Sequence, residues 1–126
     1  MAKATLYTEE IIKKYTSQGI WRPETLSDLY ENNARNYPDR EALVDSVHRL
    51  TWSQANRWID RLALGFLELG LKKDEMVVIQ LPNMVEVPLL RAACEKAGLL
   101  CLQSLRNYRH AEMGHILKYL DAVGVV

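Results

Sequence analysis

Cysteine is scarce in this sequence, which excludes a disulfide framework. The 126 residues contain two cysteines, Cys94 and Cys101, and they lack the Cys-x-x-Cys spacing of metal and redox motifs. Unpaired cysteine is among the residue types most often found inside proteins. We therefore interpret both cysteines as small core residues.

Glycine is also scarce, and it is scattered. A phosphate-binding loop needs GxGxxG or GxxxxGK[ST], because glycine lets several backbone N–H groups crowd around an anion. The six glycines stand singly, at positions 19, 65, 70, 98, 114 and 124. The sequence therefore contains no such loop, and it contains no GxSxG nucleophile elbow either.

An excess of charge and a long apolar run are both missing. Sixteen basic residues balance sixteen acidic ones, so no net field attracts nucleic acid or an anionic membrane. The longest near-continuous apolar run, Met76 to Leu81, is far shorter than the ~20 residues of a membrane span. Residues 1–6 contain no apolar signal region, and Glu9 and Glu10 follow at once. We therefore expect a cytoplasmic location.

What the sequence does have is the composition of an ordinary globular protein. Apolar residues make up 48% and charged residues 25% of the chain. A chain of this length encloses one core at most, so we expect one domain or part of one.

Two helices and a hairpin are predicted in the first half. Apolar spacing indicates a helix that begins at Thr25 and ends before Pro38. Residues 42–45 and 49–51 are expected to pair as a β-hairpin. Thr51 and Gln54 have the spacing of a capping box, which predicts a second helix ending near Gly70.

From Met76 onward, apolar stretches alternate with helix-sized spacers. The stretches cover residues 76–81, 99–102 and 123–126, and they read as strands buried on both faces. The alternation predicts a βαβαβ unit with right-handed crossovers, an α/β fold with a parallel sheet and a small hairpin.

The turn after the first of these strands contains Pro82 and Asn83 but no glycine or lysine. We interpret it as a structural strand-to-helix turn, with Asn83 as N-cap and Glu86 as its capping-box partner. Pro88 conflicts with that start, because it would lie deep enough to remove an intrahelical hydrogen bond. The helix therefore either starts later or is kinked.

Candidate chemical groups favour structural interpretations. His110 and His115 stand five apart, which places them roughly 140° apart around a helix, so we expect a solvated surface and no zinc site. Trp21, Trp52 and Trp58 are expected in the core, and ligand stacking is the less favoured alternative. We assign no catalytic, cofactor-binding or metal-binding residue.

An ordered set of short motifs resembles the N-terminal segment of AMP-forming acyl-CoA synthetases and related adenylate-forming ligases. The matching segments are residues 37–43, 50–52, 69–79, 81–86 and 96–98. Residues 15–21 are similar to the lead-in of members that activate aromatic or alicyclic acids. One departure is Asp74, which stands where the family has glycine.

The resemblance implies a parent enzyme of fatty or aromatic acid metabolism. In such a ligase ATP and a carboxylic acid form an acyl-adenylate and pyrophosphate, and coenzyme A then displaces AMP, usually with Mg²⁺ present. The family's phosphate loop, acyl pocket and catalytic lysine have no counterpart in these residues. We expect this chain alone to be inactive.

The domain organisation expected from this resemblance is a lead-in at 1–24 and a partial N-terminal subdomain at 25–126. The chain stops within a predicted core strand, so we expect a truncated subdomain whose unfinished sheet edge favours homo-oligomers. Two alternatives stay open, a free-standing non-catalytic α/β interaction module and a small nucleotide-binding domain.

Overall fold

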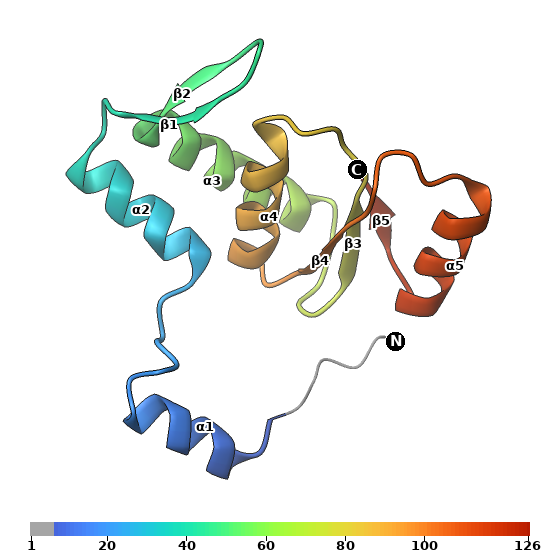
Figure 1. The fold of residues 1–126 in the computed structure, drawn as a ribbon, viewed down its shortest axis with the longest axis horizontal. Coiled ribbons are helices and arrows are strands. Elements are labelled where there is room, and N and C mark those ends of the chain that lie inside the picture. The colour runs from blue at the N-terminus through green and yellow to red at the C-terminus, as the bar shows by residue number, and fades with distance from the viewer. Residues whose placement is uncertain (1–6) are drawn as a thin grey trace.

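The computed structural model describes residues 7–126, which form five helices and five strands within that range (Figure 1). In chain order they are α1 (Glu9–Ser17), α2 (Leu26–Asn36), β1 (Glu41–Val44), β2 (Arg49–Thr51), α3 (Trp52–Glu68), β3 (Met76–Ile79), α4 (Glu86–Lys96), β4 (Leu100–Gln103), α5 (His110–Leu120) and β5 (Gly124–Val125).

The strands form a parallel sheet of order β4-β3-β5 and a separate antiparallel β1–β2 hairpin. The predicted α/β fold class and all three predicted parallel strands are confirmed. Because β3 leads to β4 on one side and β4 leads back to β5 on the other, two right-handed crossovers must place their helices on opposite faces. Figure 1 shows α4 and α5 on opposite sides of the sheet.

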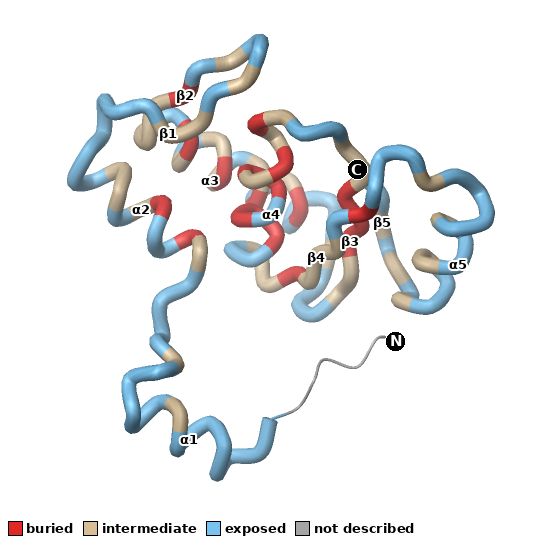
Figure 2. The backbone as a smooth tube through the Cα atoms, viewed as in Figure 1, coloured by how far each residue is buried: buried red, intermediate tan, exposed pale blue. Residues whose placement is uncertain are grey.

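The core lies on the α4 side of the sheet, where α2, α3 and the hairpin also pack (Figure 2). Ala55 and Ile59 of α3 and Leu89 of α4 are completely buried there. Val77 and Ile79 of β3 join this cluster, whereas Val78 between them is buried but lies outside it. This alternation is the period of two expected for a strand covered on both faces.

The predicted helix boundaries in the first half are confirmed. Thr25 forms a capping box with Asp28, and Thr51 forms the expected one with Gln54. Helix α2 ends at Asn36, before Pro38. Gly70 follows α3 with φ of 81°, the left-handed conformation that glycine adopts without strain.

Asp74, at the position where the resembled family carries glycine, has a φ of 66°, which is the left-handed conformation. Its backbone N–H donates to the carbonyl oxygen of Gly98, 2.9 Å away, which ties the turn before β3 to the turn before β4. The tight turn explains why glycine suits this position.

Helix α1 was not predicted. Thr8 caps it and Glu9 and Glu10 form its acidic first turn, the pattern that stabilises a helix N-terminus. None of its residues is buried. Near its end, the ring of Tyr15 contacts the ring of Trp21, with 5.3 Å between the ring centroids. Residues 15–21 therefore run from the end of α1 into a turn.

The three tryptophans pack as structural residues. Trp52 and Trp58 are half-buried against the core, and Trp52 meets the ring of Tyr30 edge-on at 5.4 Å. The core prediction is wrong for Trp21, which lies outside the core cluster and packs against Tyr15 of α1, a helix with no buried residue. Among the described residues, no helix has the length and apolar content needed to cross a membrane.

Candidate functional site

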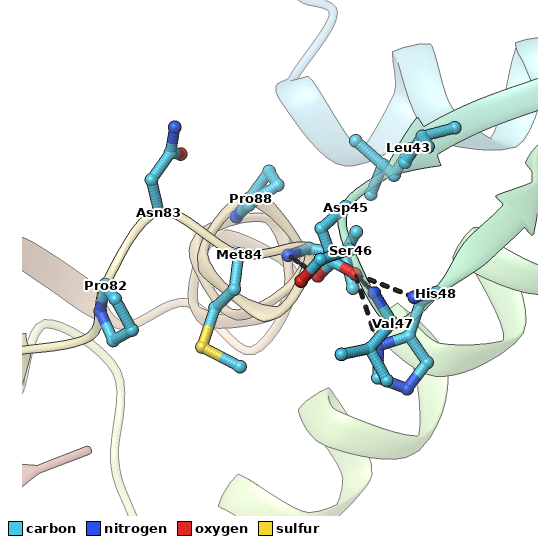
Figure 3. Close-up of a pocket in the computed structure, with 11 residues that line it drawn as sticks. Leu43, Asp45, Ser46, Val47, His48, Pro82, Asn83, Met84 and Pro88 are labelled. Carbon is cyan, nitrogen blue, oxygen red and sulfur yellow. Dashed lines mark hydrogen bonds and ion pairs between the residues drawn. The ribbon is translucent and has the colours of Figure 1, made fainter.

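The hairpin and the β3–α4 turn border an open cavity of about 700 Å³ (Figure 3). Its lining comes from two segments, residues 43–48 of the hairpin and residues 82–85 of the turn, together with Pro88 of α4. The two segments lie about forty residues apart in the chain. The fold therefore builds this cavity from parts that the sequence does not place together.

Asp45 joins the two walls of the cavity. Its Oδ1 accepts hydrogen bonds from the backbone N–H groups of Val47 at 2.8 Å and His48 at 2.7 Å, which shapes the hairpin turn. Its Oδ2 accepts from the N–H of Val85 at 3.0 Å, at the start of α4. These three donors, that of Val85 first, lower the pKa of Asp45 to about 2. Asp45 is therefore a carboxylate under all ordinary conditions.

The prediction that Asn83 caps this helix, with Glu86 as its capping-box partner, is wrong. The helix starts at Glu86, and Val85 occupies the N-cap position. The apolar side chain of Val85 makes no capping hydrogen bond. Asn83 is exposed, and Figure 3 shows its side chain pointing away from Asp45. Asp45 supplies the acceptor at this helix start from a different element.

Of the two alternatives for Pro88, the later helix start is confirmed. Pro88 is the third residue of α4, and the first four N–H groups of a helix have no intrahelical partner. Its missing N–H therefore removes no hydrogen bond. The φ angle that the proline ring fixes also suits the first turn of a helix.

His48 and Glu86 complete a cluster with Asp45 at the edge of the cavity. The Nδ1 atom of His48 lies 3.8 Å from Oδ1 of Asp45 and 3.9 Å from Oε1 of Glu86. Within residues 7–126, this is the one group of three or more His, Cys, Asp or Glu side chains close enough to hold a metal ion. The Trp58 ring lies edge-on to His48, 5.8 Å away.

Asp45, Ser46 and His48 include the residue types of a hydrolytic triad, but their arrangement does not support that chemistry. The 3.8 Å between Asp45 Oδ1 and His48 Nδ1 is longer than a hydrogen bond. That Oδ1 atom already accepts two backbone N–H groups. The carboxylate therefore stabilises the hairpin turn through these hydrogen bonds and does not orient the imidazole.

The other residues considered from sequence lie apart from this cavity. His110 and His115 are exposed on α5, and His115 stacks on Tyr119 at 5.9 Å, as expected for a solvated helix surface. Cys94 is completely buried, as predicted, whereas Cys101 is half-buried. A hydrogen bond from Cys94 lowers the pKa of Cys101 to about 7, with a smaller contribution from Arg91, and raises the pKa of Cys94.

Gln80 lies at the edge of the sheet where the strands have their carboxyl ends, which is where ligands bind in many α/β enzymes. The Nε2 atom of Gln80 donates to the backbone carbonyl oxygens of Leu105 at 3.1 Å and Tyr108 at 3.0 Å. This amide holds the β4–α5 loop. The left-handed glycines, Gly19, Gly70 and Gly98, lie in other turns.

A family model described as AMP-binding enzyme matches residues 30–126. The chain belongs to this family. It corresponds to the N-terminal segment of the large domain of adenylate-forming ligases, as the motif resemblance indicated. The confirmed family also accounts for the order of the motifs from residue 37 to residue 98.

Two curated relatives match almost the whole chain. It is 34% identical over 116 residues to "Salicylyl-CoA synthase / salicylate adenylyltransferase" of a Streptomyces species, covering 92% of this chain and 20% of the relative. It is 30% identical over 122 residues to "2,3-dihydroxybenzoate-AMP ligase" of Bacillus subtilis, covering 97% of this chain and 23% of the relative. The chain thus spans less than a quarter of either relative.

A solved structure supports the same conclusion. The apo structure of MbtA of Mycobacterium smegmatis matches with a TM-score of 0.88 and 31% sequence identity, covering 96% of this chain and 23% of the MbtA chain. The match includes α1, which the motif set did not reach, because 96% coverage extends well before residue 25.

Proposed function

We propose that this chain is the opening scaffold of an adenylate-forming ligase that activates a carboxylic acid with ATP. In the first half-reaction the carboxylate attacks the α-phosphorus of ATP, which forms an acyl-adenylate and releases pyrophosphate. In the second, the thiol of coenzyme A attacks the acyl carbon and displaces AMP. The observation that carries the proposal is the family match over residues 30–126.

An aromatic hydroxy acid is the substrate class that we propose. The two relatives described above are named for salicylate and 2,3-dihydroxybenzoate. One of those names also includes an acyl-CoA product, which supports coenzyme A as the acceptor. A carrier-protein thiol is the other acceptor, and it requires the same adenylate.

The turn after β3 does not fit the phosphates of ATP. The turn after β3 carries Pro82 and no glycine, and Gln80 at the carboxyl edge of the sheet holds the β4–α5 loop. The role of the described residues is to hold the sheet, the hairpin and three helices in one core. The reacting groups of the proposed enzyme come from chain outside residues 1–126.

The test is ATP–pyrophosphate exchange by the product of the complete gene, measured with salicylate, 2,3-dihydroxybenzoate and a medium-chain fatty acid. We expect exchange that depends on an aromatic acid, and thioester formation when coenzyme A is added. Exchange with the fatty acid alone would overturn the substrate class. No exchange with any carboxylic acid would overturn the ligase assignment.

The gene sequence after codon 126 separates the proposal from the non-catalytic interaction module. A ligase gene must continue for several hundred residues and encode a loop rich in Thr, Ser and Gly that ends in Lys. A reading frame that closes at Val126 would support the module. The small nucleotide-binding domain predicts heat on titration of this chain with ATP and Mg²⁺, and we expect none.

A further inference from the structure

We propose that Asp45, His48 and Glu86 form a binding site for a divalent transition-metal ion of the Zn²⁺ class. The ion would bind one nitrogen and two carboxylate oxygens, and water from the adjoining cavity would complete its coordination. This site joins the hairpin turn to the first residue of α4. It is independent of the adenylation chemistry proposed above.

The geometry is close to that of a three-residue metal site. One ligand atom from each of the three residues lies within 4.8 Å of the other two, and Nδ1 of His48 lies 3.9 Å from Oε1 of Glu86. Ligands of a tetrahedral zinc ion, with bonds of ~2.0–2.2 Å, lie roughly 3.3–3.5 Å from one another. Binding would therefore draw the His48–Glu86 pair together by roughly 0.5 Å and the widest pair by up to roughly 1.4 Å, estimated from those bond lengths.

Two polar atoms of this cluster are unpaired. Nδ1 of His48 and Oε2 of Glu86 are both inaccessible to solvent and have no hydrogen-bond partner. Buried polar atoms are almost always paired, so two of them in one cluster need an explanation. The separations from His48 to both carboxylates are too long for hydrogen bonds, and a bound cation would satisfy both atoms.

Asp45 is prepared for such a role. It is ionised, and its three backbone hydrogen bonds fix the carboxylate as outer-shell partners fix a metal ligand. Oδ1, which lies 3.8 Å from Nδ1 of His48, accepts two of those bonds, whereas Oδ2 accepts one and keeps a free lone pair. Oδ2 is therefore the oxygen that would bind the ion. The positive end of the α4 dipole opposes a cation here, but two full carboxylate charges outweigh that partial charge.

The ligand set decides the class of metal. Mg²⁺ and Ca²⁺ prefer sites made entirely of oxygen ligands. An imidazole with two carboxylates suits Zn²⁺, Co²⁺, Fe²⁺ and Ni²⁺. Co²⁺ is the useful probe, because it replaces Zn²⁺ in such sites and has visible d–d absorption.

The experiment is a titration of the chelator-treated chain with CoCl₂, followed by displacement with ZnCl₂. We expect d–d bands at one equivalent, their loss on addition of Zn²⁺, and a change in tryptophan emission, because the Trp58 ring lies 5.8 Å from His48. In His48→Gln and Glu86→Gln the affinity should fall by more than the roughly 10- to 100-fold that loss of an outer-shell partner costs.

Matched controls exclude other donors. His110→Gln and His115→Gln remove exposed imidazoles on α5 and should leave the titration unchanged. Cys101→Ser tests the thiol pair, and an intense thiolate-to-cobalt charge-transfer band that disappears in this variant would overturn the proposal. Glu86→Gln keeps the shape of the side chain, and circular dichroism without metal confirms that it folds.

Two further results would overturn the site. One is the absence of d–d absorption in the wild-type chain at millimolar Co²⁺. The other is equal affinity in the wild type and in folded Glu86→Gln. A Zn²⁺-dependent rise in the melting temperature of the wild type that is absent in Glu86→Gln would support the site by an independent measurement.

Discussion

Helices α4 and α5 are both eleven residues long and both are crossover helices of the same sheet, yet they are buried to very different extents. Six residues of α4 are buried, and none of α5 is. Helix α4 lies between the sheet and helices α2 and α3, whereas α5 lies on the other face, where no other helix within residues 7–126 packs against it (Figures 1 and 2). The difference comes from topology, because opposite crossover directions place the helices on opposite faces.

The strongest test of this comparison replaces one leucine in each helix. Leu89→Ala empties a fully buried position in α4 and should lower the free energy of unfolding by roughly 2–5 kcal/mol. Leu117→Ala removes a half-buried side chain of α5 and should cost about 1 kcal/mol or less. Urea unfolding followed by circular dichroism measures both. Equal losses would show that the two helices are packed equally well.

The next effect concerns the start of α4. Asp45→Asn replaces one acceptor oxygen by an amide, so it breaks the contact with Val85 or those with Val47 and His48, and the midpoint of urea unfolding should fall. Asn83→Ala, at the cap position expected from sequence, should change stability by no more than about 0.5 kcal/mol. A larger loss in Asn83→Ala than in Asp45→Asn would contradict the observed cap.

The same variant has a defined pH dependence. The pKa of Asp45 is lowered from 3.8 to about 2 in the folded state, so the unfolded chain binds the proton more readily. Its stabilising contribution is therefore complete above pH ~4 and is lost as the pH falls from ~4 to ~2. The difference in urea midpoint between wild type and Asp45→Asn should shrink across that range. A constant difference would show that the carboxylate charge is unimportant.

A smaller effect is expected from the ion pairs that Lys96 makes at the end of α4. Its Nζ contacts Glu31 of α2 and lies 2.7 Å from Oδ1 of Asp60 of α3. All three side chains are partly exposed, so Lys96→Gln should cost about 0.5–1 kcal/mol, and 1 M NaCl should remove most of that difference. Arg35→Gln, which removes a more exposed pair with Glu31, is the control and should have less effect.

The smallest effect is expected for self-association through the edge strands of the parallel sheet. Strands β4 and β5 are the two edges of the parallel sheet, and Val125 of β5 is half-exposed. We predict concentration-dependent dimers or larger species in sedimentation, and weaker association in Val125→Lys, because lysine blocks edge pairing. A wild-type monomer at all concentrations would contradict this prediction.

Much of the fold was predictable because its signals are local. The capping boxes at Thr25 and Thr51 and the three apolar strands depend on residues within a few positions of one another. Helix α1 was missed because it is short and none of its residues is buried, although Thr8 and the two glutamates after it carried a start signal.

The candidate site was not predictable, because its contacts join distant segments. Asp45 accepts from Val85, forty residues later in the chain, so no local pattern indicates this cap. Asn83 had the residue type and position of an N-cap, and only the path of the turn shows that the carboxylate of Asp45 serves instead. The cluster with His48 and Glu86 depends on the same tertiary contact.

The proposed function predicts that these residues build a scaffold and that the groups reacting with ATP lie elsewhere in the ligase. The direct measurement is AMP formation by the purified 126-residue chain incubated with ATP, Mg²⁺, coenzyme A and salicylate or 2,3-dihydroxybenzoate. We predict no AMP above a blank without protein, under conditions in which the complete gene product forms it. Acid-dependent AMP formation by this chain alone would contradict the account.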